Sequence, residues 1–323
     1  MNPDTFFEHF DLLADAPNGV QKLREMVLQL AVSGKLVPQD PDDEPAAVLL
    51  ERIRTEKDRL VKQGKIKKSE PLPPIQPDEA PYSLPDGWEW IRVGNLFDFE
   101  YGKGLPKESI AVDGKIPAYG ANGIIKYCRE PLVKNHCIIV GRKGSAGAVN
   151  KVSEPCWPLD VTFYIQPPKI LNFEYVYRLL LSLSLEKLAK GIKPGLNRNE
   201  AYLLIFGLPP VEEQTRIVAK VDQLMALCDE LEAKKQKRNE LRTQVNVAAM
   251  DKLLSAQEPD AFNESWRRVA ENFDLLYDTP ETVGKLRQAI LQLAVSGKLA
   301  PQNPADEPAS LLLERIRTEK DRL

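Results

Sequence analysis

Arg142 and Lys143 follow a short apolar run, 137–140, and stand on a turn flanked by glycines. Two adjacent cations in that position can reach a phosphate oxygen or the O6 and N7 edge of guanine. Solvated turn charges are the alternative, and the residues alone do not show whether either side chain reads a base. Arg142 and Lys143 are therefore candidate contacts to a nucleic acid.

Two further turns carry polar side chains. Tyr119 precedes an Asn-Gly pair at Asn122, which suits a turn with positive φ and favours a role in positioning a backbone. Lys193 lies before a Pro-Gly turn, after which Asn197 can cap a loop and Arg198 can pair with a phosphate or an acidic helix. For the second turn a structural or phosphate-binding role is favoured over base reading.

The patterns needed for catalysis are missing from the sequence. Methylation of adenine needs an acidic or amide residue before Pro-Pro-aromatic to hold a flipped base, and the Pro-Pro pairs here read LPPI, QPPK and LPPV. No G-x-G-x-x-G unit is present, and GRKGSAG lacks the ending of a phosphate loop. The four cysteines form no C-x-x-C pair, and only His9 and His136 could join them in a zinc site. We expect no catalytic residue, cofactor or metal in this chain.

Composition is that of a globular protein, with 43% hydrophobic and 28% charged residues. The sequence shows no apolar run of membrane-spanning length and no signal-peptide pattern, so we expect a cytoplasmic protein with free thiols. The net charge of −3 hides a gradient, since residues 101–198 contain 15 Lys and Arg against 7 Asp and Glu. A basic middle between acidic flanks is typical of one domain that meets phosphates and arms that meet protein.

The elements that hold these residues are predicted from periodicity. Apolar residues at helical spacing predict helices over 18–34 and about 46–63, and the Pro-rich stretch 64–87 predicts a linker. From 88 to 210, short apolar runs alternate with Gly-, Pro- and Asn-rich turns, which indicates a mixed or antiparallel sheet. One helix is predicted within it, over about 173–188.

A long helix is predicted over 211–254, followed by a linker over 255–270. Its apolar residues first recur at alternating steps of four and three, as in a coiled-coil seam, and a cationic segment at 234–238 interrupts them before Leu241 and Val245. We expect the seam to be covered by helices of the chain's C-terminal part or by another subunit. The predicted seam residues are Ile217, Val221, Leu224, Cys228 and Leu231.

An internal repeat brackets these elements. Residues 10–60 recur at 273–323 with 38 of 51 positions identical. We therefore expect a helical region over 1–63 and a second, truncated helical copy over 271–323. The predicted fold class is α+β: a mixed-sheet α/β domain, a long coiled-coil spacer helix and an N-terminal helical hairpin.

Several stretches together resemble the specificity (S) subunit of Type I restriction–modification enzymes. They are LPDGWEWIRVGNLF, IPAYGANGII, IIVGRKGSAG, PCWPLDVTFYI, PGLNR and LPPVEEQTRIVAKVD, in this order. The chain resembles the N-terminal half of such a subunit, with one target-recognition domain, plus the joining helices. Full-length members have two such domains, so the pairing of two half-length chains is a further expectation.

The resemblance implies a non-catalytic subunit that binds one half of a bipartite site in double-stranded DNA. It further implies that the helices dock two adenine-methylating modification subunits and, through them, restriction subunits, so that S-adenosylmethionine and ATP bind only to partners. No membrane partner is implied. The alternative is a coiled-coil scaffold whose basic domain binds protein or RNA. A neighbouring gene with an NPPF-type methylase loop would favour the first reading.

Specific readout needs side chains that differ between target sites. The basic and polar positions outside the shared stretches are therefore favoured for sequence choice, and the turn residues for positioning. The full set of expected DNA-binding residues is Tyr101, Lys103, Lys107, Tyr119, Asn122, Lys126, Arg129, Arg142, Lys143, Lys193, Asn197 and Arg198.

Overall fold

The structure is a computed structural model that describes residues 9–66, 70–109, 114–189, 195–300, 303 and 305–322. The chain divides into two compact units, Met1–Glu232 (unit 1) and Ala233–Leu323 (unit 2), and each is described by itself. Helix α8 (Val211–Ser255) begins in unit 1 and ends in unit 2. Within the described residues, no helix combines the length and apolar character needed to cross a membrane.

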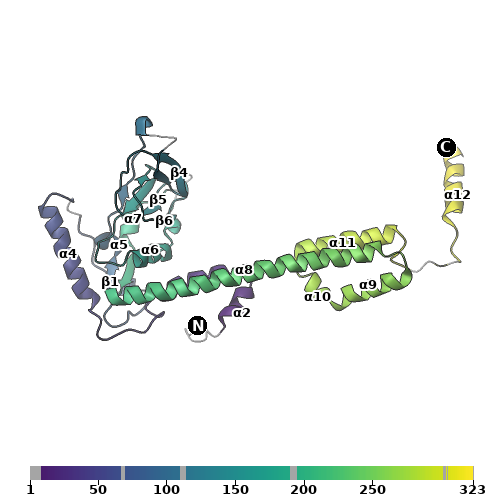
Figure 1. Ribbon diagram of the computed structural model, residues 1–323, viewed down its shortest axis with the longest axis horizontal. Coiled ribbons are helices and arrows are strands. Elements are labelled where there is room, and N and C mark those ends of the chain that lie inside the picture. Colours follow the sequence, from purple (N-terminus) through teal and green to yellow (C-terminus); the bar gives the residue numbers. More distant parts are fainter. Residues whose placement is uncertain are drawn as a thin grey trace. The chain divides into compact units, whose positions relative to one another are not determined.

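Unit 1 contains short strands between residues 88 and 210, which we call the sheet domain (Figure 1). The strands β3 and β7 run parallel, and the other neighbours are antiparallel. These mixed sheets and the surrounding helices confirm the predicted α+β fold class. In sheet order the strands are β1 (Glu89–Arg92) and β9 (Ile205–Leu208); β2 (Glu100–Tyr101), β8 (Thr162–Ile165), β5 (Cys137–Gly141) and β6 (Val149–Val152); and β4 (Gly123–Cys128), β3 (Ile116–Gly120) and β7 (Trp157–Pro158).

The core of the sheet domain lies around β5. All five residues of β5 are buried, as a continuous apolar run between two partner strands requires. Helix α6 (Phe173–Ser182) packs near it, and Asn172 caps α6 by accepting hydrogen bonds from two backbone N–H groups of its first turn. The predicted helix over 173–188 is shorter than expected, because Ser184 adopts a left-handed φ of 49° before the 3₁₀ turn Leu185–Leu188.

The first copy of the repeat folds against the sheet domain. It forms helices α2 (Phe10–Asp15), α3 (Gly19–Val32) and α4 (Ala46–Lys62). The side of α4 that carries Leu49 and Leu50 is buried in the same core as the sheet domain. The first backbone N–H of α4 donates to the carbonyl oxygen of Gly87 at 2.8 Å. The first-copy helices are therefore part of one core with the sheet domain.

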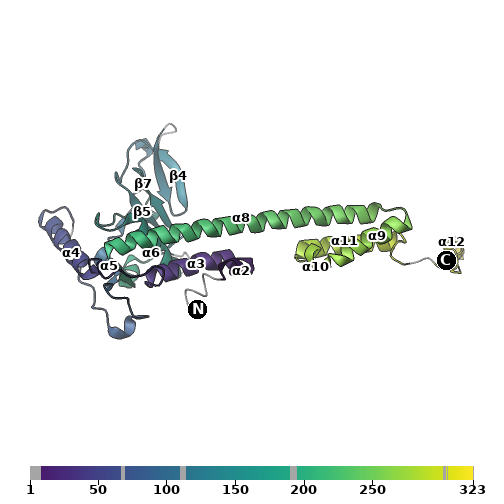
Figure 2. The same ribbon diagram turned by 60° about the horizontal axis from the view of Figure 1, so that its bottom comes forward.

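The predicted seam of α8 packs against α3, which lies alongside it (Figure 2). Four of its residues are buried and Leu231 is half-buried. The sequence predicted a partner from the C-terminal part of the chain or another subunit, whereas the structure has the first-copy helix there. Charge supports this pairing, because Arg24 of α3 forms ion pairs with Asp229 and Glu232 of α8 at 2.7 and 2.8 Å.

We expect the replacement Cys228→Ser to lower the free energy of unfolding by about 1–2 kcal/mol, because the Cys228 side chain is fully buried in this apolar seam and a hydroxyl there loses its hydrogen bonds to water. Urea unfolding followed by tryptophan fluorescence measures the change. The matched control is Ala219→Ser, an exposed position of the same helix, where a change within about 0.5 kcal/mol is expected. Equal effects of the two replacements would contradict the buried seam.

Unit 2 contains the end of α8 and the second copy of the repeat. Helices α10 (Phe273–Leu276) and α11 (Pro280–Val295) pack with α8 through a small core that includes Met250, Leu253 and Leu293. The predicted linker over 255–270 is wrong for most of its length. Unit 2 also contains helices α9 (Pro259–Glu271) and α12 (Ala309–Arg322).

Helix α9 replaces that linker for a physical reason. Pro259 occupies the first helical turn, where a missing N–H leaves no intrahelical hydrogen bond unmade. Val269 is buried and Phe262 half-buried against α8. Pro259, which suggests a linker in the sequence, is therefore the first residue of a helix.

Identical residues of the two copies have different surroundings. Leu49 is 1% exposed in α4, whereas its counterpart Leu312 in α12 is 53% exposed. Ile53 is likewise buried, while Ile316 is exposed. The sheet domain buries this face of α4. The same face of α12 is uncovered within the described residues.

Candidate nucleic-acid interface

Three of the predicted residues come together around one aromatic ring at the surface of the sheet domain. The guanidinium carbons of Arg142 and Arg198 lie 5.4 and 5.0 Å from the ring centroid of Tyr101. The Tyr101 ring is 50% exposed and packs against Phe163 on its buried side, with centroids 4.9 Å apart. We call Tyr101, Arg142 and Arg198 the arginine–tyrosine cluster.

Arg142 is held in place at the end of β5. Its Nε and Nη2 atoms donate to the carbonyl oxygen of Asp160 at 3.2 and 2.6 Å. Its backbone N–H donates to Val161, and its carbonyl accepts from Leu196, both at 2.9 Å. The guanidinium is fixed by these bonds and remains half-exposed, so it can present its remaining N–H groups to a ligand.

Arg198 begins helix α7 (Arg198–Leu203) and approaches Tyr101 from a different segment. Its Nη1 donates to the carbonyl oxygen of Phe99 at 3.3 Å. Its Nε is buried and has no hydrogen-bond partner among the described residues. Burial raises the pKa of the neighbouring Tyr202, whose ring also lies against the Arg198 guanidinium. The Arg198 guanidinium is thus held by one hydrogen bond and by the rings of Tyr101 and Tyr202.

The remaining residues of the Pro-Gly turn lie beside this cluster. Lys143 is exposed and forms a backbone bridge with Gly195. Asn197 caps α7, since its Oδ1 accepts a hydrogen bond from the backbone N–H of Asn199 at 3.0 Å. This contact fits the structural alternative that the sequence left open for Asn197. Lys193 lies outside the described residues.

A second group of predicted residues lies on the hairpin formed by β3 and β4. Asn122 is exposed at its tip, where Gly123 adopts a φ of 116° that a side chain would strain. Tyr119 is half-buried, burial raises the pKa of its phenol, and its carbonyl accepts from the backbone of Leu159. Lys126 is half-buried on β4. These contacts agree with a positioning role for the turn.

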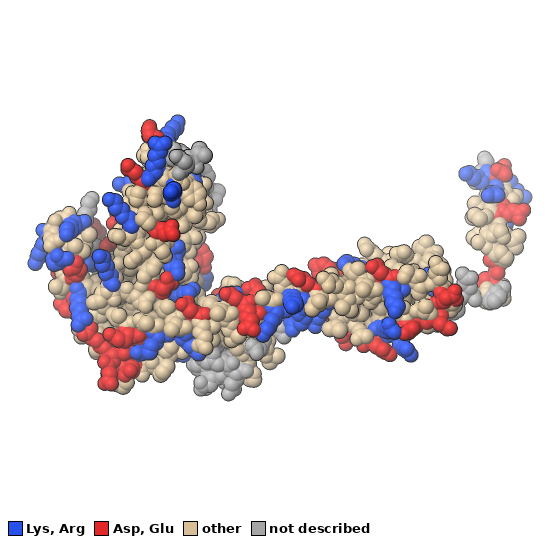
Figure 3. Space-filling model, in the orientation of Figure 1, with Lys and Arg blue, Asp and Glu red and all other residues tan. Residues whose placement is uncertain are grey.

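Three further predicted cations are arranged near this hairpin. Lys103 is exposed, and its carbonyl accepts from the Nε1 of Trp157 at 2.8 Å. Arg129 is exposed at the end of β4, and its backbone N–H donates to Ser109. Ser109 closes the short 3₁₀ turn that begins at Lys107. Lys and Arg side chains gather at the end of the sheet domain that carries β4 (Figure 3).

Three apolar residues of β4 were not among the residues expected from the sequence. Ile124, Ile125 and Tyr127 are exposed on both sides of Lys126. Strand β4 is an edge strand, and an exposed apolar edge is normally avoided unless it binds something. The sequence did contain a signal for this exposure. In a half-buried strand apolar and polar residues alternate, whereas here Lys126 stands among apolar residues directly after the Asn-Gly turn.

The described residues contain no group of three or more His, Cys, Asp and Glu side chains that could hold a metal ion. Cys137 and Cys156 have sulfurs 3.6 Å apart in a buried cluster. Apart from this thiol pair, the candidate interface offers cations, amides and aromatic rings. Such groups are suited to anions and planar rings.

The chain is similar to proteins of known function. Residues 85–242 match the family model described as the Type I restriction modification DNA specificity domain. The chain is 37% identical, over 94% of its length, to the EcoAI and EcoEI specificity subunits of Type I restriction enzymes from Escherichia coli. It covers 56% of each of them, so the chain spans about half the length of these relatives.

A crystal structure of the Type I restriction–modification S subunit from M. genitalium also matches, with a TM-score of 0.43 and 18% identity over 72% of this chain and 55% of that one. The family match over residues 85–242 places the sheet domain in the class of DNA specificity domains. The chain belongs to the family of Type I restriction–modification specificity subunits.

Proposed function

We propose that this chain is the DNA-recognition subunit of a Type I restriction–modification enzyme. The sheet domain binds one half of a bipartite site in double-stranded DNA and catalyses no reaction. The observation that carries the proposal is the arginine–tyrosine cluster, in which two guanidinium groups and a half-exposed ring meet at the surface of the sheet domain. Guanidinium groups suit phosphates and the O6 and N7 edge of guanine.

The β3–β4 hairpin adds a second contact to the same DNA. Lys126 and Arg129 provide cations there, and exposed Ile124 and Ile125 provide surfaces for thymine methyl groups. Lys103 and Lys107 take part in sequence choice, Lys143 contacts phosphate, and Asn197 acts through α7. Lys193 also belongs to the proposed DNA-binding residues.

The helices dock partner subunits. Relatives of this chain are specificity subunits of restriction enzymes, which supports docking of adenine-methylating modification subunits and of restriction subunits. S-adenosylmethionine and ATP then bind to those partners, and the complex acts on cytoplasmic DNA. The exposed face of α12 that carries Leu312 and Ile316 offers a contact surface for a second copy of the chain, so that two half-length chains pair in a homodimer.

A binding assay tests the proposed function. The full chain, alone and with its modification subunits, is incubated at moderate salt with a pool of random duplexes, and bound DNA is sequenced. We expect enrichment of one bipartite motif, with half-sites of order one duplex turn apart. Binding without sequence preference, or no binding, would contradict the proposal.

A further inference from the structure

Two cysteine side chains touch inside the sheet domain. The sulfur atoms of Cys137 and Cys156 lie 3.6 Å apart and share a hydrogen bond, and both side chains are fully buried. Cys137 is the first residue of β5, and Cys156 immediately precedes β7. Both residues are free thiols. We call them the thiol pair.

The sulfurs of the thiol pair are close enough to be joined by a disulfide. Such a bond is about 2.05 Å long, so the two sulfurs have to approach each other by about 1.5 Å. Side-chain rotation with a small backbone shift achieves this movement. The other two cysteines make different contacts, because the sulfur of Cys128 lies against the carbonyl oxygens of Ile116 and Glu130 and Cys228 belongs to the α8 seam.

The thiol pair lies directly beneath the surface, at the ends of two loops. Residues 134–136 precede Cys137 and residues 153–155 precede Cys156, and every residue of these two short segments is exposed. Opening of a loop end costs much less free energy than unfolding of the whole domain. A small solute therefore reaches the sulfurs while the sheet domain stays folded.

The two thiols differ in their readiness to ionise. Their shared hydrogen bond raises the pKa of Cys137, which burial raises further, and the same hydrogen bond lowers the pKa of Cys156. The thiolate is the reactive form of cysteine. Cys156 is therefore the nucleophile of the pair, and Cys137 keeps its proton until a second step.

We propose that the thiol pair is a redox modification site, which a low-molecular-weight disulfide converts to an intramolecular disulfide that weakens DNA binding. The Cys156 thiolate attacks one sulfur of the small disulfide, which forms a mixed disulfide and releases one small thiolate. The Cys137 thiol then loses its proton and attacks the Cys156 sulfur, which forms the Cys137–Cys156 bond and releases the second small thiolate. The pair loses two electrons and two protons, and the small disulfide becomes two thiols.

The thiol pair is connected to the residues proposed to bind DNA. Trp157 follows Cys156 directly, pairs with Ala118 of β3, and donates its Nε1–H to the carbonyl oxygen of Lys103 at 2.8 Å. Tyr119 packs against the cluster that contains the pair. Because protein interiors are close-packed, a shift of Cys156 also moves these neighbours. The effect on DNA binding rests on the proposed function, whereas formation of the disulfide does not.

Oxidation of the folded full-length chain tests the proposal. The chain is incubated with an excess of oxidised glutathione, alkylated and digested, and the peptides are identified by mass spectrometry. We expect one disulfide, between Cys137 and Cys156. The variant Cys137→Ser is expected to retain glutathione on Cys156, whereas Cys156→Ser is expected to be modified at least about tenfold more slowly. The matched control Cys128→Ser should form the same disulfide as the unchanged chain.

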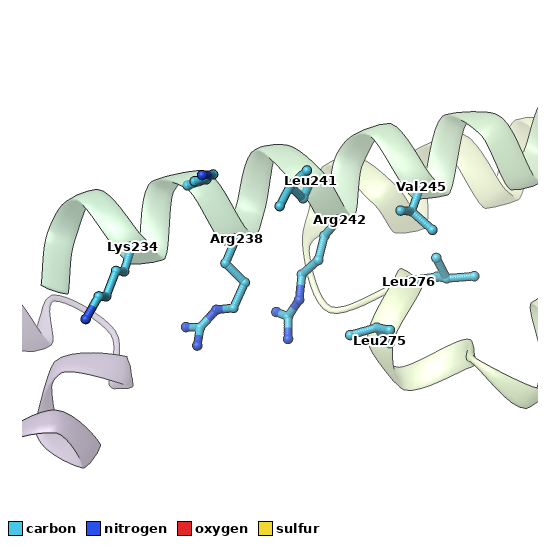
Figure 4. A pocket seen from close by; sticks show the side chains of 8 residues that line it. Lys234, Arg238, Leu241, Arg242, Val245, Leu275 and Leu276 are labelled. Carbon is cyan, nitrogen blue, oxygen red and sulfur yellow. The ribbon is translucent and has the colours of Figure 1, made fainter. Parts of the chain in front are cut away.

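An exposed reference thiol sets the reaction period. Leu241 is 52% exposed on α8 in unit 2, where its side chain lies near those of Arg238 and Arg242 (Figure 4). The variant Leu241→Cys therefore reacts with glutathione without any opening of the structure. Absence of the Cys137–Cys156 bond after about 100 times this reaction period overturns the proposal. A bond that forms only in urea, or one that includes Cys128 or Cys228, overturns it as well.

DNA affinity of the reduced and oxidised chain tests the consequence. We expect the oxidised chain to bind its specific duplex about fivefold more weakly or less tightly still, and treatment with a reducing dithiol to restore the affinity. The double variant Cys137→Ala/Cys156→Ala should not respond to glutathione. Equal affinities of the reduced and oxidised chain overturn the effect on DNA binding and leave the proposed function standing. A reduced chain without specific DNA binding contradicts the proposed function itself.

Discussion

The double variant Arg142→Ala/Arg198→Ala is expected to bind specific duplex DNA about 100-fold more weakly than the unchanged chain. Each guanidinium lies against the Tyr101 ring and offers donors to the same patch of surface. Loss of a bidentate contact to guanine removes about 1–3 kcal/mol, and two such losses account for the expected factor. Each single variant is expected to lose less. Fluorescence anisotropy with a labelled duplex measures the affinities.

The salt dependence of binding identifies what the two arginines contact. If both meet phosphates, the slope of log K against log salt falls by about 1.8, because each contact contributes about 0.9. If they read guanine, the slope changes little and discrimination against a substituted base pair is lost. Replacement of both residues by Lys keeps the charge without the planar fork, so it restores phosphate binding better than base reading.

An exposed lysine outside the candidate interface gives the control. Lys169→Ala is expected to change the affinity by less than about twofold. Urea unfolding of the double variant shows whether the hydrogen bonds to Asp160 and Phe99 matter for stability. Unchanged DNA affinity of a folded double variant would contradict a role of the cluster in recognition.

The elements of this fold could be predicted where local periodicity determines them. The helices over 18–34 and 46–63 and the long helix from 211 were read from apolar spacing and occur as α3, α4 and α8. Helix α9 was missed because Pro259 and polar neighbours gave a linker signal. The α+β fold class was likewise predicted from the alternation of short apolar runs with Gly-, Pro- and Asn-rich turns over 88–210, together with the helices on either side.

The candidate site could be predicted by residue type but not by arrangement. Tyr101, Arg142 and Arg198 come from three segments distant in sequence, and no local pattern places two guanidinium groups on one ring. The exposure of Ile124 was missed because burial of an apolar strand depends on what packs over it. The repeat makes the same point, since Leu49 and Leu312 occupy matching positions and only one of them is buried.

Arg92 joins three parts of unit 1 at the end of β1. The side chain is buried, and its Nε donates to the carbonyl oxygen of Pro73 at 2.7 Å. Its Nη1 donates to Leu203 at 2.8 Å, and its Nη2 donates to Pro74 and to the carboxylate of Glu79. The guanidinium therefore ties the segment that enters the sheet domain to the end of α7, the helix that begins with Arg198.

The replacement Arg92→Met is expected to lower the free energy of unfolding by about 2–4 kcal/mol, because it removes a buried guanidinium that donates to three part-buried carbonyl oxygens and to the carboxylate of Glu79. Arg92→Lys keeps the charge but cannot reach all three carbonyls, so an intermediate loss of about 1–3 kcal/mol is expected. Urea unfolding followed by tryptophan fluorescence measures both, since Trp88, Trp90 and Trp157 lie in unit 1. DNA affinity should fall with stability, because α7 loses its anchor.

The control for this prediction is Arg54→Met on α4. Arg54 is well exposed and forms only a loose ion pair of 3.9 Å with Glu51, a contact that contributes little to stability in water. A change within about 0.5 kcal/mol is expected there. If Arg92→Met were no more harmful than Arg54→Met, the segment before β1 would be held by its backbone alone. The position of α7, and of Arg198 with it, would then need another explanation.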